Sequence, residues 1–314
     1  MKDVVNLNLP ESVTIVEVGP RDGLQNEDAE VSTENKIGLI DCLSRTGLKR
    51  IEVTSFTHPA WIPRLQDAES VMNGLNRGKG ICYSALVPNR RGYERAMKCG
   101  TDEIVLLVSA SETHNRKNVN RTIAETLEDL RGICSDIVQS NVKIRGSIAM
   151  AFQCPFEGKI PVDRVLYIVK EFKRMGAYEV ALADTAGLAH PAQVWEVFSK
   201  IYHNVTEISL AGHFHNTYGF ALANVFASLQ NGVRIFDASV GGLGGCPYIP
   251  EASGNIATED LVYMMETMGI ETYIDLPKLM KCSRLINTLI KKTGRSCLAE
   301  KMFEINVKGR KADQ

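Results

Sequence analysis

The segment Glu207-Ile208-Ser209-Leu210-Ala211-Gly212-His213-Phe214-His215 is an apolar run that ends in two histidines. Its composition is typical of a buried strand, and alternate side chains of a strand point to the same side. We therefore expect His213 and His215 to project together from the end of this strand. Two imidazoles held side by side suit a divalent metal ion, although the alternative is one core histidine and one exposed histidine.

Apolar runs of the same kind occur on both sides of this segment. They predict eight strands, at residues 13–18, 50–54, 81–87, 103–109, 142–149, 178–183, 208–213 and 234–240. The amphipathic segments between them predict helices at 33–45, 91–99, 120–139, 161–175, 191–203 and 219–231. Glycine follows several of these helices, and its left-handed backbone stops a helix. Eight strand–helix units of about 30 residues favour a parallel sheet closed into a (β/α)8 TIM barrel over a doubly wound open sheet.

We expect all 314 residues to form one catalytic domain. The barrel would occupy residues 11–256, and helices at 258–268, 276–293 and 297–303 would pack over it within a C-terminal part at 257–305. A polar tail follows. A chain of this length can bury a large core, and 44% hydrophobic with 23% charged residues is an ordinary globular balance.

Charge and composition argue against several classes of partner. The net charge of −1 gives no electrostatic footprint for nucleic acid or for an anionic membrane. No apolar run approaches the roughly 18–20 residues that span a bilayer, and the N-terminus lacks the apolar core of a signal peptide. The eight cysteines form no CxxC pair, so we expect reduced thiols in a cytoplasmic protein.

The active site of a barrel lies at the C-terminal ends of its strands, and polar residues gather there in this sequence. Arg21 and Asp22 follow the first predicted strand, and Glu52 lies on the second. Asp22 offers a hard oxygen ligand beside His213 and His215, a set that suits Mg2+, Mn2+ or Zn2+. Glu52 would pair with Arg21 and hold its guanidinium against an oxygen that becomes negative. The alternative for Arg21 and Asp22 is a solvated turn with a surface ion pair.

A glycine-rich segment, residues 241–245, follows the eighth predicted strand and leads to Cys246. Its glycines give the loop freedom to close over a ligand, and a thiol there can donate or accept a proton. A lone cysteine is otherwise usually a small buried hydrophobe. Asn255 can add a neutral oxygen ligand or cap the helix that follows. Asp184 can contact a substrate hydroxyl group or cap a helix.

Together these residues resemble the 3-hydroxy-3-methylglutaryl-CoA lyases. The matching segments are Val16-Glu17-Val18-Gly19-Pro20-Arg21-Asp22-Gly23-Leu24-Gln25-Asn26-Glu27, Glu52-Val53-Thr54-Ser55-Phe56, Cys154-Pro155-Phe156-Glu157-Gly158, Gly241-Gly242-Leu243-Gly244-Gly245-Cys246-Pro247-Tyr248 and Ala252-Ser253-Gly254-Asn255-Ile256-Ala257-Thr258-Glu259-Asp260. The resemblance covers residues 11–300. It implies a metal-dependent lyase of the TIM-barrel group that shares an Asp-Arg-Glu signature, here Asp22, Arg21 and Glu52.

The resemblance, joined to the reasoning above, implies a division of roles. The metal ligands would be Asp22, His213, His215 and Asn255. The catalytic residues would be Arg21, Glu52, Asp184 and Cys246. The substrate contacts would be Arg21, Gln25, Ser147 and Gly244. Weaker candidates for contacts with coenzyme A are Arg116, Lys117 and Asn118, which we place in a loop after the fourth strand.

The implied reaction is cleavage of a 3-hydroxyacyl-CoA, above all 3-hydroxy-3-methylglutaryl-CoA to acetyl-CoA and acetoacetate, a step of leucine degradation and ketone-body formation. A metal ion would lower the pKa of the 3-hydroxyl group, and His213 or Asp184 would take its proton. Arg21 would stabilise the enolate oxygen, and Cys246 would protonate the carbanion. We expect Mg2+ or Mn2+, with Zn2+ as the alternative, and a homodimer or higher homo-oligomer.

Three departures from the family pattern lie near the expected acyl site. They are Ser147 in place of a tyrosine, Asn216 in place of an aspartate, and Thr57-His58-Pro59-Ala60-Trp61 in place of Val-Ser-Pro-Lys-Trp. A related thioester such as citramalyl-CoA is therefore an alternative substrate. Three other functions are weighed against the lyase. One is a synthase, for which the sequence leaves no room for the usual regulatory domain. The second is a CoA-independent aldolase or decarboxylase. The third is a binding protein on a degenerate barrel, against which the retained site residues argue.

Overall fold

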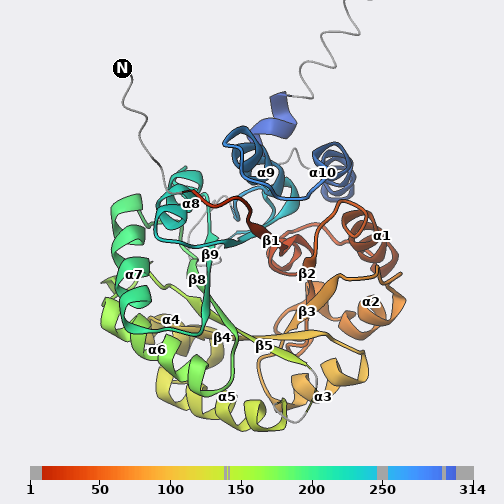
Figure 1. Cartoon of the computed structure of the whole chain (residues 1–314). Helices are drawn as coiled ribbons and strands as arrows, with labels where there is room; N and C mark the ends of the chain where they lie inside the picture. The colour runs from red at the N-terminus through yellow and green to blue at the C-terminus, as the bar shows by residue number, and fades with distance from the viewer. Residues whose placement is uncertain (1–8, 138–139, 141, 246–253, 292–294, 302–314) are drawn as a thin grey trace, which may run out of the picture.

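The computed structural model describes residues 9–137, 140, 142–245, 254–291 and 295–301. Its eight parallel strands close into a barrel in the order β1-β10-β9-β8-β5-β4-β3-β2 (Figure 1). They are β1 (Thr14–Glu17), β2 (Arg50–Ser55), β3 (Cys82–Leu86), β4 (Glu103–Ser109), β5 (Lys143–Ala149), β8 (Glu179–Asp184), β9 (Ser209–Phe214) and β10 (Ile235–Ala238). The predicted (β/α)8 barrel is confirmed, and no predicted strand end is displaced by more than two residues.

Helices surround the barrel on the outside (Figure 1). They are α1 (Thr33–Leu43), α2 (Ala68–Gly74), α3 (Arg90–Lys98), α4 (Glu112–Val119), α5 (Ile123–Ile137), α6 (Val162–Arg174), α7 (Pro191–Asn204) and α8 (Ala221–Gln230). Hydrogen bonds from side chains and glycine residues determine where some of these helices begin and end. The Ser32 hydroxyl accepts the Asn35 N–H before α1, and Gly176, in the left-handed region at φ +84°, follows α6.

Two of these helices and one hairpin were not predicted from the sequence. They are α2, α4 and the hairpin of β6 (Gln153–Cys154) and β7 (Gly158–Lys159). The expectation that Arg116, Lys117 and Asn118 lie in a loop is wrong, because all three belong to α4. The polar composition of this helix hid it: the residues that α4 buries are His114 and Asn115, so its sequence has no apolar stripe.

Two long helices follow the barrel, α9 (Thr258–Thr267) and α10 (Leu276–Ile290). Figure 1 shows them side by side next to β1, where the first and last strands of the barrel meet. Helix α10 packs against α9, α1 and the short helix η3 (Val240–Gly242) that follows β10. These contacts place α9 and α10 against the glycine-rich segment. The polar tail predicted at the C-terminus lies outside the described residues.

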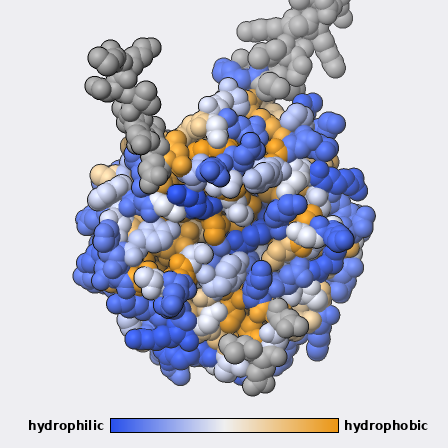
Figure 2. All heavy atoms as spheres, in the orientation of Figure 1, coloured by the Kyte–Doolittle hydropathy of each residue, from blue (hydrophilic) through white to orange (hydrophobic). Residues whose placement is uncertain are grey.

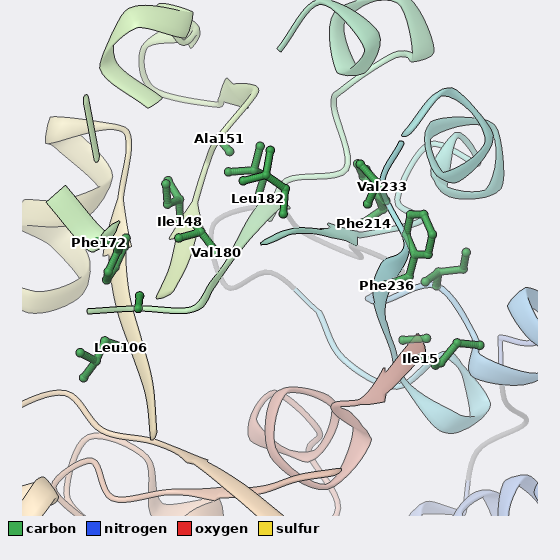
Figure 3. Close-up of a cluster of buried hydrophobic side chains, with 14 of the residues drawn as sticks. Ile15, Leu106, Ile148, Ala151, Phe172, Val180, Leu182, Phe214, Val233 and Phe236 are labelled. Atoms are coloured by element: carbon green, nitrogen blue, oxygen red, sulfur yellow. The ribbon is translucent and has the colours of Figure 1, made fainter. Parts of the chain in front are cut away.

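The hydrophobic core lies between the strands and the surrounding helices (Figure 3). On β5, Ile144 and Ile148 belong to this core, whereas Arg145 and Ser147 point to the other side, into the barrel. Gly146 faces α6 so closely that a Cβ there would lie 2.7 Å from the ring of Phe172. Burying a phenylalanine of this kind contributes roughly 1.5–3 kcal/mol. The core thus fixes which side of each strand faces the site.

The outer surface is mostly polar. Figure 2 shows hydrophilic side chains around the outline of the face that it presents, with smaller hydrophobic patches between them. Among the described residues, no helix combines the length and the apolar composition that crossing a membrane requires.

Candidate metal centre

Asp22 reaches the barrel mouth because the chain turns sharply after β1. In the turn η1 (Gly19–Gly23) the N–H groups of Arg21, Asp22 and Gly23 all donate to the carbonyl of Val18. A Cβ at Gly19 would lie 2.6 Å from a carboxylate oxygen of Glu17, so the tight turn requires glycine there. The turn places Asp22 opposite the end of β9, which carries His213 and leads to His215.

Asp22, His213 and His215 form one group of ligand atoms, as the sequence predicts. One atom from each of the three side chains lies within 4.8 Å of the other two. The Nε2 atoms of His213 and His215 lie 3.8 Å and 3.7 Å from Oδ2 of Asp22. These separations are too long for hydrogen bonds, so three electron-pair donors converge without bonding one another. Two nitrogens and one oxygen arranged in this way fit a divalent ion and leave coordination positions for a substrate.

The electrostatics of the group favour metal binding. Burial opposes ionisation of Asp22, but the Arg21 guanidinium and the two imidazoles outweigh it and lower the pKa of Asp22 to about 2. Burial and the adjacent His213 ring lower the pKa of His215 to about 4. At neutral pH the carboxylate is therefore charged and His215 is neutral, which are the forms that bind a metal.

His213 is held differently from His215. Its Nδ1 atom lies 3.0 Å from Oδ2 of Asp237, its register partner on β10. Burial disfavours protonation of His213, but this hydrogen bond and the charges of Asp237 and Asp22 raise its pKa above the ordinary value. The Nδ1 atom of His215 is buried and has no hydrogen-bond partner among the described residues. Within the part of the chain that the structure describes, His213 is thus oriented by a carboxylate and His215 is not.

The predicted pair of Arg21 and Glu52 is present. Nε and Nη2 of Arg21 donate to the two carboxylate oxygens of Glu52 at 2.7 and 3.1 Å, and Nη1 donates to Oδ1 of Asp22 at 2.6 Å. Both members of the pair are buried. A guanidinium has five N–H groups, so two remain beyond these bonds for a substrate oxygen. Arg21 is thereby fixed in a bidentate pair at the edge of the metal-ligand group.

Asn255 lies beside the group, but its orientation differs from the sequence expectation. Its Nδ2 atom donates to Oδ2 of Asp22 at 2.7 Å and to the carbonyl of Leu243 at 3.1 Å. The amide nitrogen, and not the carbonyl oxygen, therefore faces Asp22. Asn255 also pairs with His215 through a backbone bridge. Its role as an oxygen ligand stays a prediction, whereas its place next to the other three is established.

Asp184 is the last residue of β8, and its side chain binds the loop that follows. Its two carboxylate oxygens accept the N–H groups of Leu188 and Ala189, each at 3.0 Å, and its side chain is fully buried. Burial raises the pKa of Asp184 to about 7. Asp184 therefore holds the loop before α7, whose N-cap is His190, and the helix-capping alternative is wrong. A catalytic role for Asp184 stays a prediction.

The predicted substrate contacts are spread around the barrel mouth. Ser147 is buried on β5, between Leu107 of β4 and Ala181 of β8. Gln25 is half-buried just after η1. The Gly244 carbonyl accepts a hydrogen bond from Nη1 of Arg295 at 3.1 Å. Cys246, the predicted proton donor, lies outside the described residues.

Sequence reasoning assigned no role to two buried carboxylates that hold the site together. Oε1 of Glu17 accepts the N–H groups of Gly19 and Val240, and Oε2 accepts the Thr258 hydroxyl. Burial raises the pKa of Glu17 to about 7. Asp237 orients His213. Both interrupt apolar strand segments, and a carboxylate in a buried strand is the signal that points to a specific partner.

Comparisons with known proteins agree with this geometry. The sequence matches the family model described as HMGL-like over residues 12–286. Hydroxymethylglutaryl-CoA lyase YngG of Bacillus subtilis (strain 168) is 48% identical over 277 residues, which are 88% of this chain and 93% of that protein. A crystal structure of the Bacillus subtilis HMG-CoA lyase has a TM-score of 0.92 at 46% identity, covering 94% and 99% of the two chains. An HMG-CoA lyase of Acinetobacter baumannii, solved with coenzyme A and 3-methylmalate, has a TM-score of 0.88 at 43% identity, covering 92% and 95%.

Proposed function

Because this chain belongs to the HMGL-like family, we propose that Asp22, His213 and His215 hold the divalent ion of a hydroxymethylglutaryl-CoA lyase. The protein is a carbon–carbon lyase that cleaves 3-hydroxy-3-methylglutaryl-CoA to acetyl-CoA and acetoacetate. One observation carries the assignment. Three metal-ligand atoms converge at the same barrel mouth where Arg21 has N–H groups that bond to none of the described residues.

The reaction breaks the bond between C2 and C3 of the acyl group. The 3-hydroxyl group loses its proton, C3 becomes the ketone carbon of acetoacetate, and the bonding electron pair moves to C2. C2 and the thioester carbonyl then share the negative charge as an enolate, and a proton delivered to C2 completes acetyl-CoA. A divalent ion, when bound, lowers the pKa of the hydroxyl group that it contacts.

Residues of this chain supply the other tasks. Arg21 donates its free N–H groups to the thioester oxygen, where negative charge develops, while Glu52 keeps the guanidinium from turning. Glu52 acts through Arg21 and is a positioning residue. Cys246 delivers the proton to C2, as the family resemblance implies. We assign the base that takes the hydroxyl proton to Asp184 rather than to His213. A His213 ring that holds the ion through Nε2 and donates from Nδ1 to Asp237 has no lone pair left to accept a proton. Both oxygens of Asp184 bind loop amides.

We assign Mg2+ or Mn2+ as the ion, with Zn2+ as the alternative. An aspartate oxygen and two imidazole nitrogens suit all three ions, and positions open to a substrate with oxygen ligands favour the first two. We also place the protein in the cytoplasm, as a homodimer or higher homo-oligomer. Size-exclusion chromatography coupled to light scattering tests the oligomeric state directly.

A second substrate is a methyl-branched malyl thioester such as citramalyl-CoA. The observation that favours it is the 3-methylmalate bound in the Acinetobacter baumannii relative, which is a methyl-branched hydroxy acid. In this chain the neighbouring strands β5 and β8 carry small side chains at the paired positions Ser147 and Ala181.

A panel of thioesters tests the function. Purified protein with Mg2+ is incubated with 3-hydroxy-3-methylglutaryl-CoA and with citramalyl-CoA, and acetyl-CoA is followed by chromatography. We expect acetyl-CoA and acetoacetate in equal amounts from the first thioester and loss of both products with Asp22→Asn. If a folded protein that binds the metal releases acetyl-CoA from neither thioester, the lyase assignment is wrong. Turnover of free pyruvate or oxaloacetate alone would then indicate the CoA-independent aldolase or decarboxylase.

A further inference from the structure

The barrel interior contains a chain of charged side chains that ends at the metal-ligand group. Arg145 of β5 is 1% exposed and extends across the barrel to β10, where Nη1 and Nη2 donate to the two oxygens of Asp237 at 3.1 and 2.6 Å. Its Nε donates to Oε1 of Glu179 at 2.5 Å. Glu179 is the register partner of Arg145 on β8, just as His213 is the register partner of Asp237 on β9.

The chain continues away from the metal-ligand group. Arg50 of β2 donates from Nη1 and Nη2 to the two oxygens of Glu179 at 2.8 and 3.0 Å, and from Nη2 to both oxygens of Glu103 at 3.1 Å. Glu103 also accepts the hydroxyl hydrogen of Tyr178. Anions and guanidinium groups therefore alternate through the interior, and each charge is compensated by its neighbours.

Where this row of charged side chains meets the metal-ligand group, it determines which nitrogen of His213 carries a proton. Both oxygens of Asp237 accept hydrogen bonds from the Arg145 guanidinium, so Asp237 is a carboxylate and has no proton to donate. The contact between Asp237 and Nδ1 of His213 then requires that Nδ1 be the donor. The lone pair of His213 consequently resides on Nε2, the atom that faces Asp22.

We propose that Asp237 and Arg145 are positioning residues for metal binding: Asp237 selects the Nδ1–H tautomer and the ring orientation of His213, and Arg145 holds Asp237 in place from the opposite side of the barrel. The inference rests on the proposed function, because it concerns a ligand of that metal centre. Neither residue belongs to the ligand group of Asp22, His213 and His215. Outer carboxylates of this kind typically change metal affinity by 10- to 100-fold.

A purely structural role for the charged chain makes a different prediction. Buried ion pairs stabilise or destabilise a fold as a whole, so their loss would change the melting temperature and leave metal affinity unchanged. The matched control is Lys36→Met, which removes another ion pair with a buried lysine, 2.6 Å from Asp67, in the layer outside the barrel. It should lower the melting temperature without changing the affinity for Mn2+.

The experiment measures the dissociation constant of Mn2+ from the free-ion signal in electron paramagnetic resonance. The proteins are the wild type, Asp237→Asn, Arg145→Lys and Lys36→Met. We expect Asp237→Asn to weaken binding 10- to 100-fold. Arg145→Lys should weaken it less, because lysine keeps the positive charge but cannot donate to both oxygens of Asp237 as the guanidinium group does. Binding by Asp237→Asn within twofold of the wild type would overturn the inference and leave the proposed function intact. Failure of the wild type to bind Mn2+ would overturn both.

A second measurement is made on the wild-type protein and therefore does not depend on whether Asp237→Asn folds. Long-range 1H–15N correlation spectra of metal-free protein labelled in histidine report the tautomer of each ring, recorded at a pH at which the imidazoles are neutral. We expect His213, identified by its loss in His213→Gln, to carry its proton on Nδ1. A proton on Nε2 of His213 would overturn the inference.

Discussion

In the proposed mechanism, Arg21 is held in place before negative charge develops on the substrate. Its guanidinium group is bound by Glu52 on one side and by Asp22 on the other. The side chain therefore needs little reorganisation when an enolate forms. Lysine would keep the charge but would not form the two-point pair with Glu52. We expect Arg21→Lys to lower kcat/KM by roughly 10²–10³-fold, the usual effect of losing one such donor.

Arg95→Lys is the matched control for this substitution. Arg95 also forms a two-point pair, with Glu69 at 2.5 and 2.8 Å, but on helix α3 outside the barrel. The kcat/KM of Arg95→Lys should equal that of the wild type. Equal losses in the two variants would mean that the pair of Arg21 and Glu52 has no special part in the reaction.

Glu17 makes stability depend on pH. In the folded protein burial raises the pKa of Glu17 to about 7 from its ordinary value of 4.5. Between these values the unfolded chain has released the proton while the folded chain keeps it, so stability falls as pH rises from 4.5 to 7 and is constant above. The resulting change in the free energy of unfolding is on the order of a few kcal/mol.

Glutamine at position 17 would remain neutral and could keep the bonds to Gly19, Val240 and Thr258. We therefore expect the stability of Glu17→Gln relative to the wild type to increase from pH 4.5 to 7. Urea unfolding at a series of pH values measures this difference. A difference that stays constant with pH would contradict the account of Glu17.

At the scale of single residues, the sequence predicted that Asp22, His213 and His215 lie together and that Arg21 pairs with Glu52. These residues lie at the ends of strands or on neighbouring strands, and the ends of barrel strands meet at one face. It did not predict the contact between Arg145 and Asp237. Those residues lie on β5 and β10, which β8 and β9 separate around the barrel, and no spacing in the sequence records such a crossing. The side-chain orientation of Asn255 was likewise beyond a pattern of residue types.

Among the elements, the backbone of Gly244 in the glycine-rich segment closely approaches Gly254, the residue before Asn255. Gly254 has φ +64°, and a Cβ there would lie 2.5 Å from the carbonyl carbon and oxygen of Gly244. Gly244 in turn leaves no room for a Cβ, which would lie 2.7 Å from Nδ2 of Asn255. An alanine at 254 would therefore displace the backbone next to Asn255 and Asp22.

We expect Gly254→Ala to lower kcat/KM on the order of 10²-fold, as a displacement of about 1 Å does in a preorganised site. Gly219→Ala is the control, because φ there is +77° but a Cβ would meet nothing within 4 Å. Both variants carry the backbone strain of roughly 1–2 kcal/mol, and only the first carries the clash. Full activity of Gly254→Ala would show that the close approach of the two backbones is not needed.

The elements themselves were predictable where burial repeats along the sequence. All eight barrel strands are short apolar runs, and α5, α6 and α7 bury one apolar stripe each. The short helix α2 and the polar helix α4 were not predicted. Their few buried positions give no period that distinguishes a helix from a loop.

For the whole molecule, the proposed metal centre brings together distant parts of the chain. Asp22 follows β1, the two histidines come from the end of β9, and an ion bound between them would link the first and penultimate strands of the barrel. A ligand that binds the folded state alone stabilises it, by about 2.7 kcal/mol at a concentration of 100 times Kd. We expect Mg2+ at that concentration to raise Tm by about 5 °C relative to EDTA.

Asp22→Asn should abolish this difference in Tm between Mg2+ and EDTA, because the carboxylate that faces both imidazoles is lost. Differential scanning fluorimetry of both proteins in both buffers makes the comparison. An equal shift in the wild type and in Asp22→Asn would place the stabilising ion elsewhere in the protein.

The central claim is that the ion held by Asp22, His213 and His215 is the one on which the lyase reaction depends. A parallel titration tests it most directly: metal-free protein receives Mn2+ in steps, and bound ion and acetyl-CoA release from 3-hydroxy-3-methylglutaryl-CoA are measured on the same samples. The account predicts that the rate rises in proportion to bound Mn2+ and reaches its maximum at one ion per chain, with neither ion nor rate in Asp22→Asn. Full acetyl-CoA release by the metal-free protein, or by Asp22→Asn, would contradict it.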